Sequence, residues 1–260
     1  MKSKIGRLGG ASLLALLMGV ASAQAATLIG LTADGQLVKI DTATLAASAP
    51  MKISESDRIL GIDVRPADGK LYGLTGAGQL VTIDTASGKA TPVAMLSTKV
   101  ELGARPVVDF NPVADRLRVI AADGASLRID VQTGTTTVDK PLVYDTADAN
   151  AGKKPAVAAG AYTNSTKGAK ATELFHVDGG TGALVLQNPP NDGILNTRGA
   201  VGITGADVVM DIVQEGEGKN TVYLIAGTTL HTVDLATGKA TQVGAIKGLT
   251  AKLVDVAVTN

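Results

Sequence analysis

Four aspartates recur inside short apolar runs of the sequence, and each has an apolar residue on both sides. These residues are Asp63, Asp109, Asp211 and Asp255. Carboxylates repeated on strands that line a channel can bind a cation such as Ca²⁺, which prefers hard oxygen ligands. A second interpretation stays open, because a buried carboxylate needs hydrogen-bond donors and could find them in the next repeat.

A polar segment at residues 143–155 breaks the apolar pattern. It contains Asp145, Asp148 and Asn150, whose spacing could hold Ca²⁺ but lacks the residue order and the distal Glu of an EF-hand loop. Long loops on a rigid scaffold often carry binding sites, so these side chains are candidate ligands. A solvated surface loop is the competing interpretation.

A second such segment, residues 187–198, reads QNPPNDGILNTR and is rich in turn-forming and amide residues. Its candidate binding residues are Asn188, Asn191, Asp192, Asn196 and Arg198. One interpretation is a rigid polar recognition loop. The other is an ordinary hairpin whose prolines block edge pairing.

Hydrolytic chemistry has few candidate groups. The chain has no Cys and two His, and it has neither a G-x-S-x-G nor an H-E-x-x-H motif. Both histidines, His176 and His231, are interpreted as residues on the faces of predicted strands. An acid–base pair among the 24 acidic residues stays open. Four arginines could pair an anionic ligand or form cross-strand ion pairs: Arg65, Arg116, Arg118 and Arg128.

Most of these residues belong to a repeat of about 45 residues, which is the period of a β-propeller blade. Each copy has an apolar strand, a small turn, a second strand and a further turn, with additional strands before and after. The five copies span residues 28–41, 71–84, 117–130, 174–187 and 222–234. In three of them the second strand ends in Asp followed by a turn that closes on Gly, whereas the first copy has Leu45 at that place.

The two ends of the chain complement each other. The first copy lacks the strand that precedes the others, and residues 253–258 form a strand left over at the end. We expect this last strand to complete the first blade, because closing the ring removes both open sheet edges. The sequence therefore predicts an all-β, single-domain propeller with five four-stranded blades. A two-sheet sandwich and an open stack of hairpins are the alternatives.

Composition excludes several kinds of partner. The 24 basic and 24 acidic residues give a formal charge of zero, so the chain lacks the positive field that nucleic-acid binding needs. Two Phe, four Tyr and no Trp leave little aromatic surface for stacking on sugars or bases. The 31 Gly suit a fold with many tight turns.

The N-terminal 25 residues have the pattern of a secretory signal peptide. Lys2, Lys4 and Arg7 precede a short apolar run, and small residues then offer cleavage after Ala23 or Ala25. The apolar run is too short to span a membrane, and no later segment is long enough. We therefore expect a mature propeller domain of residues 26–260 in the periplasm or outside the cell.

Several motifs resemble the secreted bacterial family known as domain of unknown function 4394. They are L-Y-G-L, D-F-N-P-V-A-D-R-L-R-V, A-Y-T-N and L-Q-N-P-P-N-D-G-I-L-N-T, and the resemblance runs from about Leu28 to Ile246. The resemblance implies a propeller-like fold and export. It implies no activity and no catalytic residue.

These observations leave two hypotheses for function. The first is a non-catalytic binding or protein-interaction module, monomeric, whose partner is an unidentified small molecule or protein and not a nucleic acid. The second is a hydrolase or lyase with a carboxylate-bound cation in the central channel. The sequence identifies no cofactor, although its acidic residues could hold Ca²⁺.

Overall fold

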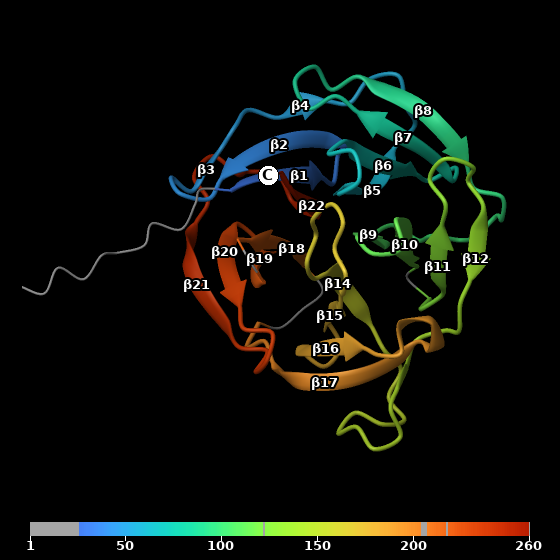
Figure 1. Cartoon of the computed structure of the whole chain (residues 1–260). Helices are drawn as coiled ribbons and strands as arrows, with labels where there is room; N and C mark the ends of the chain where they lie inside the picture. Colours follow the sequence, from blue (N-terminus) through green and yellow to red (C-terminus); the bar gives the residue numbers. More distant parts are fainter. Residues whose placement is uncertain (1–25, 122, 204–206, 217, 260) are drawn as a thin grey trace, which may run out of the picture.

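The computed structural model describes residues 26–121, 123–203, 207–216 and 218–259. The predicted signal peptide lies outside these residues. Almost all regular structure is β-strand, arranged as five small sheets around a ring (Figure 1). None of the described residues forms a helix long and apolar enough to cross a membrane.

Each sheet is one blade, and its strands run in order from the centre of the ring to the rim. Blade 1 contains β22 (Leu253–Thr259), β1 (Thr27–Thr32) and β2 (Gln36–Asp41), with the short β3 (Ala46–Ala47) and β4 (Met51–Lys52) both paired to β2. Blade 2 contains β5 (Ile59–Val64), β6 (Leu71–Thr75), β7 (Gln79–Ile83) and β8 (Ala90–Met95). Blade 3 contains β9 (Val107–Asn111), β10 (Arg116–Ile120), β11 (Ser126–Ile129) and β12 (Thr136–Val138).

The last two blades follow the same plan. Blade 4 contains β14 (Val157–Tyr162), β15 (Leu174–Asp178), β16 (Ala183–Gln187) and β17 (Ile194–Ala200), and β13 (Val143–Tyr144) adds a parallel strand outside β17. A short 3₁₀ helix, η1 (Pro190–Asp192), connects β16 to β17. Blade 5 contains β18 (Val208–Glu215), β19 (Lys219–Ala226), β20 (Thr229–Val233) and β21 (Ala240–Ala245).

The ring closes as the sequence predicts. The C-terminal strand β22 pairs antiparallel with β1 and forms the innermost strand of blade 1. Each innermost strand contacts those of the two neighbouring blades, so β22, β5, β9, β14 and β18 surround the axis. The prediction of a five-bladed propeller closed by the C-terminal strand is therefore confirmed.

The hydrophobic core lies between the faces of neighbouring blades, with one cluster of buried residues at each interface. Between blades 2 and 3, for example, the rings of Tyr72 and Phe110 meet edge to face at 5.3 Å between centroids. The cluster between blades 3 and 4 has the fewest residues. That interface instead buries Arg118, which is 1% exposed and bonds to Tyr162 in blade 4.

Candidate functional site: three carboxylates on the propeller axis

Three of the four predicted aspartates meet on the axis of the ring. Asp63 on β5, Asp109 on β9 and Asp211 on β18 each place one carboxylate oxygen within 4.8 Å of the others. Their side chains are almost completely buried, with exposed fractions of 6%, 3% and 4%. Three blades therefore contribute one acid each to a single cluster.

Strand register explains why these three meet. Asp63 lies opposite Tyr72, Asp109 opposite Arg118 and Asp211 opposite Tyr223, which is the same position in the L-Y-G-L, L-R-V-I and V-Y-L-I copies of the repeat. Residues at the same position of the repeat lie at the same level along the propeller axis, so the three aspartates face one another. Blade 4 has Ala161 at this height, opposite Phe175.

Asp255 does not join the cluster, although the sequence run V-D-V resembles I-D-V around Asp63. In blade 1 the equivalent position is Ala257, which lies opposite Ile29, whereas Asp255 lies opposite Leu31. Asp255 is therefore displaced by two residues, or about 7 Å along the strand. The structure places three of the four candidate metal ligands together and separates the fourth.

All four aspartates also link neighbouring blades by hydrogen bonds. Each accepts one from a backbone N–H on the innermost strand of the next blade: Asp255 from Ile62 (2.8 Å), Asp63 from Phe110 (2.7 Å), Asp109 from Tyr162 (2.9 Å) and Asp211 from Val258 (2.6 Å). The two interpretations of the sequence therefore apply to the same side chains. Oδ2 of Asp109 accepts no hydrogen bond from the described part of the chain.

If all three carboxylates were ionised, no basic side chain paired with them in the described part of the chain would neutralise their negative charge. Burial raises the pKa of Asp211 to about 7, and burial together with the charge of Asp211 raises the pKa of Asp63 well above its usual range. The pKa of Asp109 is raised well above its usual range by burial and by the charges of Asp63 and Asp211. None of the ion pairs among the described residues involves these carboxylates. Protons or a bound cation must offset the charge.

A pocket of about 300 Å³ opens onto this cluster from one end of the axis. Asp63 and Asp211 form part of its lining, together with Arg65 and with Ser165, Thr166 and Lys167 of the β14–β15 loop. Figure 1 shows this loop, in yellow, reaching over the middle of the ring. The cluster is therefore accessible from the end at which β5 and β18 finish.

An arginine crosses the opposite end of the axis. Arg105 precedes β9 of blade 3, and its guanidinium donates a hydrogen bond to the Val208 carbonyl oxygen (3.0 Å) at the start of β18 in blade 5. It also pairs with Asp207 (3.4 Å), which a second cation, Lys252, contacts at 2.5 Å. Because blades 3 and 5 are not neighbours, the contacts of Arg105 cross this end of the axis.

The segment 143–155 extends beyond the rim of blade 4 (Figure 1). Asp148 accepts hydrogen bonds from the backbone N–H (2.6 Å) and the hydroxyl (2.8 Å) of Thr197 on β17, and Asn150 donates to the same hydroxyl (3.0 Å). Asp145 accepts from the backbone N–H of Ala147 within its own turn (2.8 Å). Asp148 and Asn150 attach the segment to blade 4, and none of the three side chains lines the axial pocket.

The segment 187–198 is also bonded to its own surroundings. Asn191 accepts from Arg118 (2.9 Å), the Asn196 amide donates to the Asn188 carbonyl oxygen (3.1 Å), and Asp192 pairs with Lys140 (2.7 Å). Arg198 is exposed on β17. The structure gathers none of these side chains into the axial pocket.

The arginines and histidines have partners within the fold. Arg65 pairs with Asp115 and Asp68, Arg116 with Asp130, and both Arg118 and Arg128 with Asp139. His176 is fully buried between blades 3 and 4, where its Nε2 lies 2.6 Å from Oε1 of Gln187. His231 lies on β20, with its Nδ1 3.2 Å from the Thr229 carbonyl oxygen.

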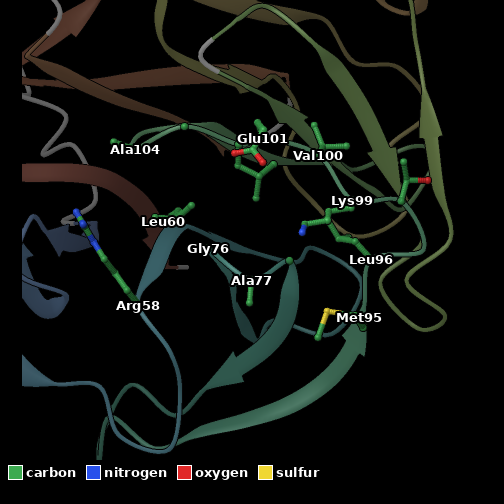
Figure 2. Close-up of a pocket in the computed structure, with 14 residues that line it drawn as sticks. Arg58, Leu60, Gly76, Ala77, Met95, Leu96, Lys99, Val100, Glu101 and Ala104 are labelled. Atoms are coloured by element: carbon green, nitrogen blue, oxygen red, sulfur yellow. The ribbon is translucent and has the colours of Figure 1, made fainter.

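Sequence reasoning missed a larger pocket of about 580 Å³ at the other end of blade 2 (Figure 2). It is bounded by the β6–β7 turn at Gly76–Gly78 and by the connection from β8 to β9, including Lys99 and Glu101. The length of that connection, residues 96–106, is the sequence feature that could have indicated it. This pocket is separate from the axial cluster.

The fold and site define a five-bladed β-propeller with a buried acidic cluster on its axis. Residues 50–257 match the family described as domain of unknown function (DUF4394), and the chain belongs to that family. No curated protein sequence matches the chain.

Solved structures similar to this chain include three proteins from Bacteroides. A protein of unknown function from Bacteroides thetaiotaomicron is 14% identical, with a TM-score of 0.53, and the match covers 89% of this chain and 61% of that one. One from Bacteroides caccae is 10% identical (TM-score 0.44; 88% and 77% covered). An auxiliary nutrient binding protein from Bacteroides ovatus is 13% identical (TM-score 0.46; 82% and 57% covered). This chain thus spans about three fifths of the length of two of them, and the likeness concerns the fold alone.

Proposed function

We propose that the protein is an exported, non-catalytic binding module whose axial pocket holds a hard divalent cation such as Ca²⁺. Asp63, Asp109 and Asp211 would be the ligands. The observation that carries this proposal is the convergence of three buried carboxylates without a cationic side chain beside them in the described part of the chain. Export is proposed from the basic, apolar and small-residue pattern of the first 25 residues.

The backbone hydrogen bonds support a metal-binding role as well as a structural one. Donors from the next blade hold the carboxylates of Asp63, Asp109 and Asp211 in fixed orientations, as second-layer contacts do around metal ligands. Ca²⁺ takes about six to eight oxygen ligands. Three aspartates leave positions open for water or for a bound molecule entering through the pocket.

The histidines favour binding over catalysis, because the acids that line the pocket, Asp63 and Asp211, are the proposed cation ligands. A hydrolase or lyase would need a proton donor or acceptor beside the cation. His176 is buried between two blades and His231 lies on β20, and neither lines the axial pocket. The Arg65 guanidinium at the pocket is held by Asp115 at 2.8 Å and 2.5 Å.

Thermal unfolding with and without divalent cations tests the proposal. After treatment with EDTA, Ca²⁺ at about one hundred times its Kd should stabilise the fold by about 2.7 kcal/mol. For a domain of this size, that raises the Tm by about 5 to 10 °C. Asp211→Asn should abolish the response, whereas Asp57→Asn, at an exposed acid, should retain it. No shift with any divalent cation at millimolar concentration would overturn the proposal.

A further inference from the structure

We propose that the blade 2 pocket, the cavity of about 580 Å³ between the β6–β7 turn and the β8–β9 connection, binds an apolar dipeptide with free ends. The ammonium group of the peptide would pair with Glu101, and its terminal carboxylate would pair with Lys99. Its apolar side chains would contact Leu60 and Leu96. This site is independent of the cation proposed for the axis, because the two pockets share no lining residue.

Two opposite charges line the blade 2 pocket without partners. Lys99 and Glu101 both belong to the β8–β9 connection, and neither side chain forms an ion pair or a hydrogen bond with any described residue. The third charged residue of the pocket, Arg58, donates to the Ala33 carbonyl oxygen of blade 1 (3.3 Å), and Figure 2 shows its guanidinium directed away from Lys99. A lone anion or cation would meet one like charge here, whereas a ligand that carries both charges can pair with both residues.

The backbone sets the distance between these two charges. Val100 and Leu102 pack with the core cluster of blades 2 and 3, whereas Lys99 and Glu101 are exposed, and residues 99–103 contain no turn or bend. Such alternation places the two charged residues on one side of an extended segment, with their Cα atoms about 7 Å apart. Two residues of extended peptide also span about 7 Å, and a single amino acid spans about half of that. A dipeptide therefore fits the spacing of the charges.

The wall opposite Lys99 is a turn that lacks the acid of its repeat. The first copy of the repeat has A-D-G at this turn and the second has G-A-G, so Ala77 stands where blade 1 has Asp34. The two turns share one backbone shape, with a φ of 81° at Gly35 and 80° at Gly78. Blade 2 thus borders its pocket with a turn that carries no charge to compete for Lys99.

Apolar side chains complete the blade 2 pocket. Leu60 and Leu102 belong to the hydrophobic core and also line the pocket, beside Leu96 and the exposed thioether of Met95. Figure 2 shows Leu60 and Leu96 on either side of the space that lies above the β6–β7 turn. Pockets for small molecules commonly have such a lining with a few polar groups, and about 580 Å³ is within their usual range of volume.

Isothermal titration with matched peptides, at pH 7 in EDTA, tests this inference. We expect leucyl-leucine to bind, and N-acetyl-leucyl-leucine amide, which lacks both charges, to bind at least about tenfold more weakly. Leucine, which is shorter, should also bind more weakly. Lys99→Met and Glu101→Gln should each lower the affinity for leucyl-leucine about tenfold. Lys170→Met is the control, because Lys170 is exposed in blade 4 and does not line this pocket.

Ala77→Asp provides a variant that the fold should accept, since blade 1 carries aspartate in the same turn. The added acid would compete for Lys99, so the affinity should fall about threefold while the Tm is unchanged.

The inference is overturned if neither leucyl-leucine nor its blocked form binds, or if leucine or the blocked form binds as tightly as leucyl-leucine. Full affinity in Lys99→Met or in Glu101→Gln would also overturn it. Because EDTA is present throughout, failure of the proposed cation site leaves these outcomes unchanged, and the two proposals can fail separately.

Discussion

Gly134 of blade 3 lies against the carbonyl oxygen of Met95 in blade 2, so closely that a Cβ at Gly134 would overlap that oxygen. Gly134 has a φ of 75°, and its carbonyl oxygen accepts a hydrogen bond from the N–H of Ser97 (2.9 Å). The glycine at the end of the turn therefore joins two blades at their outer strands.

Gly134→Ala should destabilise the protein by about 3 kcal/mol or more, because the new methyl group must displace a neighbouring backbone. Gly124→Ala is the matched control, since Gly124 has a φ of 92° but open space around it. Its expected cost is about 1 kcal/mol, from the positive φ alone. Urea unfolding measures both, and equal costs would show that the contact with Met95 contributes nothing.

In the absence of divalent cations, Asp211 should contribute progressively less stability as the pH rises from about 4 to about 7. The pKa of Asp211 is raised from 3.8 to about 7 in the folded state, so folding favours its protonated form. The stabilisation from Asp211 is full below the pKa of the unfolded state and is lost as the pH rises through the pKa of the folded state. Its upper limit is about 4 kcal/mol. Asp211→Asn should flatten the profile of Tm against pH in EDTA, and an unchanged slope would contradict this assignment.

His176 should act in the opposite direction. Burial lowers its pKa from 6.5 to about 4, so the contribution to stability is present above about 6.5 and disappears as the pH falls toward 4. The expected loss is at most about 3 kcal/mol. A His176→Gln variant should show a smaller acid-side decrease in the free energy of unfolding, and an NMR titration should find the ring neutral at pH 5. A ring charged at pH 6 would refute the prediction.

Arg118→Met should destabilise the protein by about 3 kcal/mol or more. The change leaves Ser126, Asn191 and the Tyr162 hydroxyl without their buried donor, at the interface with the smallest apolar cluster. Arg116→Met is the control, because Arg116 forms a partly exposed ion pair with Asp130 and a hydrogen bond to the Asp115 carbonyl oxygen, and its loss should cost less than about 1 kcal/mol. Chemical unfolding of both variants makes the comparison, and a similar cost for the two would argue against a supporting role for the buried guanidinium.

The repeat could be predicted because its turns and strand alternation are local. The exception at Leu45 is explained by a distant residue. Leu45 has a positive φ of 52°, and its side chain occupies space beside Gly244 of blade 5, where a Cβ would lie 2.6 Å from Leu45 Cδ1. Gly244, which has no side chain, thus leaves room in blade 5 for the side chain of Leu45.

The position of Asp255 could not be predicted, because a shift of two residues leaves a side chain on the same face of a strand. Alternation therefore places Asp255 and Asp63 on equivalent faces but does not fix their heights. The direction of the polar side chains in residues 143–155 and 187–198 was equally undetermined. Their composition indicates polarity, whereas their contacts with Thr197 and Arg118 depend on the folded blade.

For a related reason, the sequence did not indicate that the β14–β15 loop, which carries Lys167, lines the axial pocket. The loop is placed by the pairing of Asn164 with Asn220, which are far apart in the chain. Those contacts connect blades 4 and 5, the one neighbouring pair without an aspartate bond between innermost strands, because blade 4 has Ala161 at that height.

The pairing of β1 with β22 also governs how the molecule reaches its folded state. The first blade is assembled from residues 27–52 and 253–259, so it stays incomplete until the two extremes of the described chain meet. Contacts of such long sequence separation make folding slow, since the intervening chain must lose its freedom before they form. Asp211 of the axial cluster accepts a hydrogen bond from Val258 of β22, so its final position depends on the strand that closes the ring.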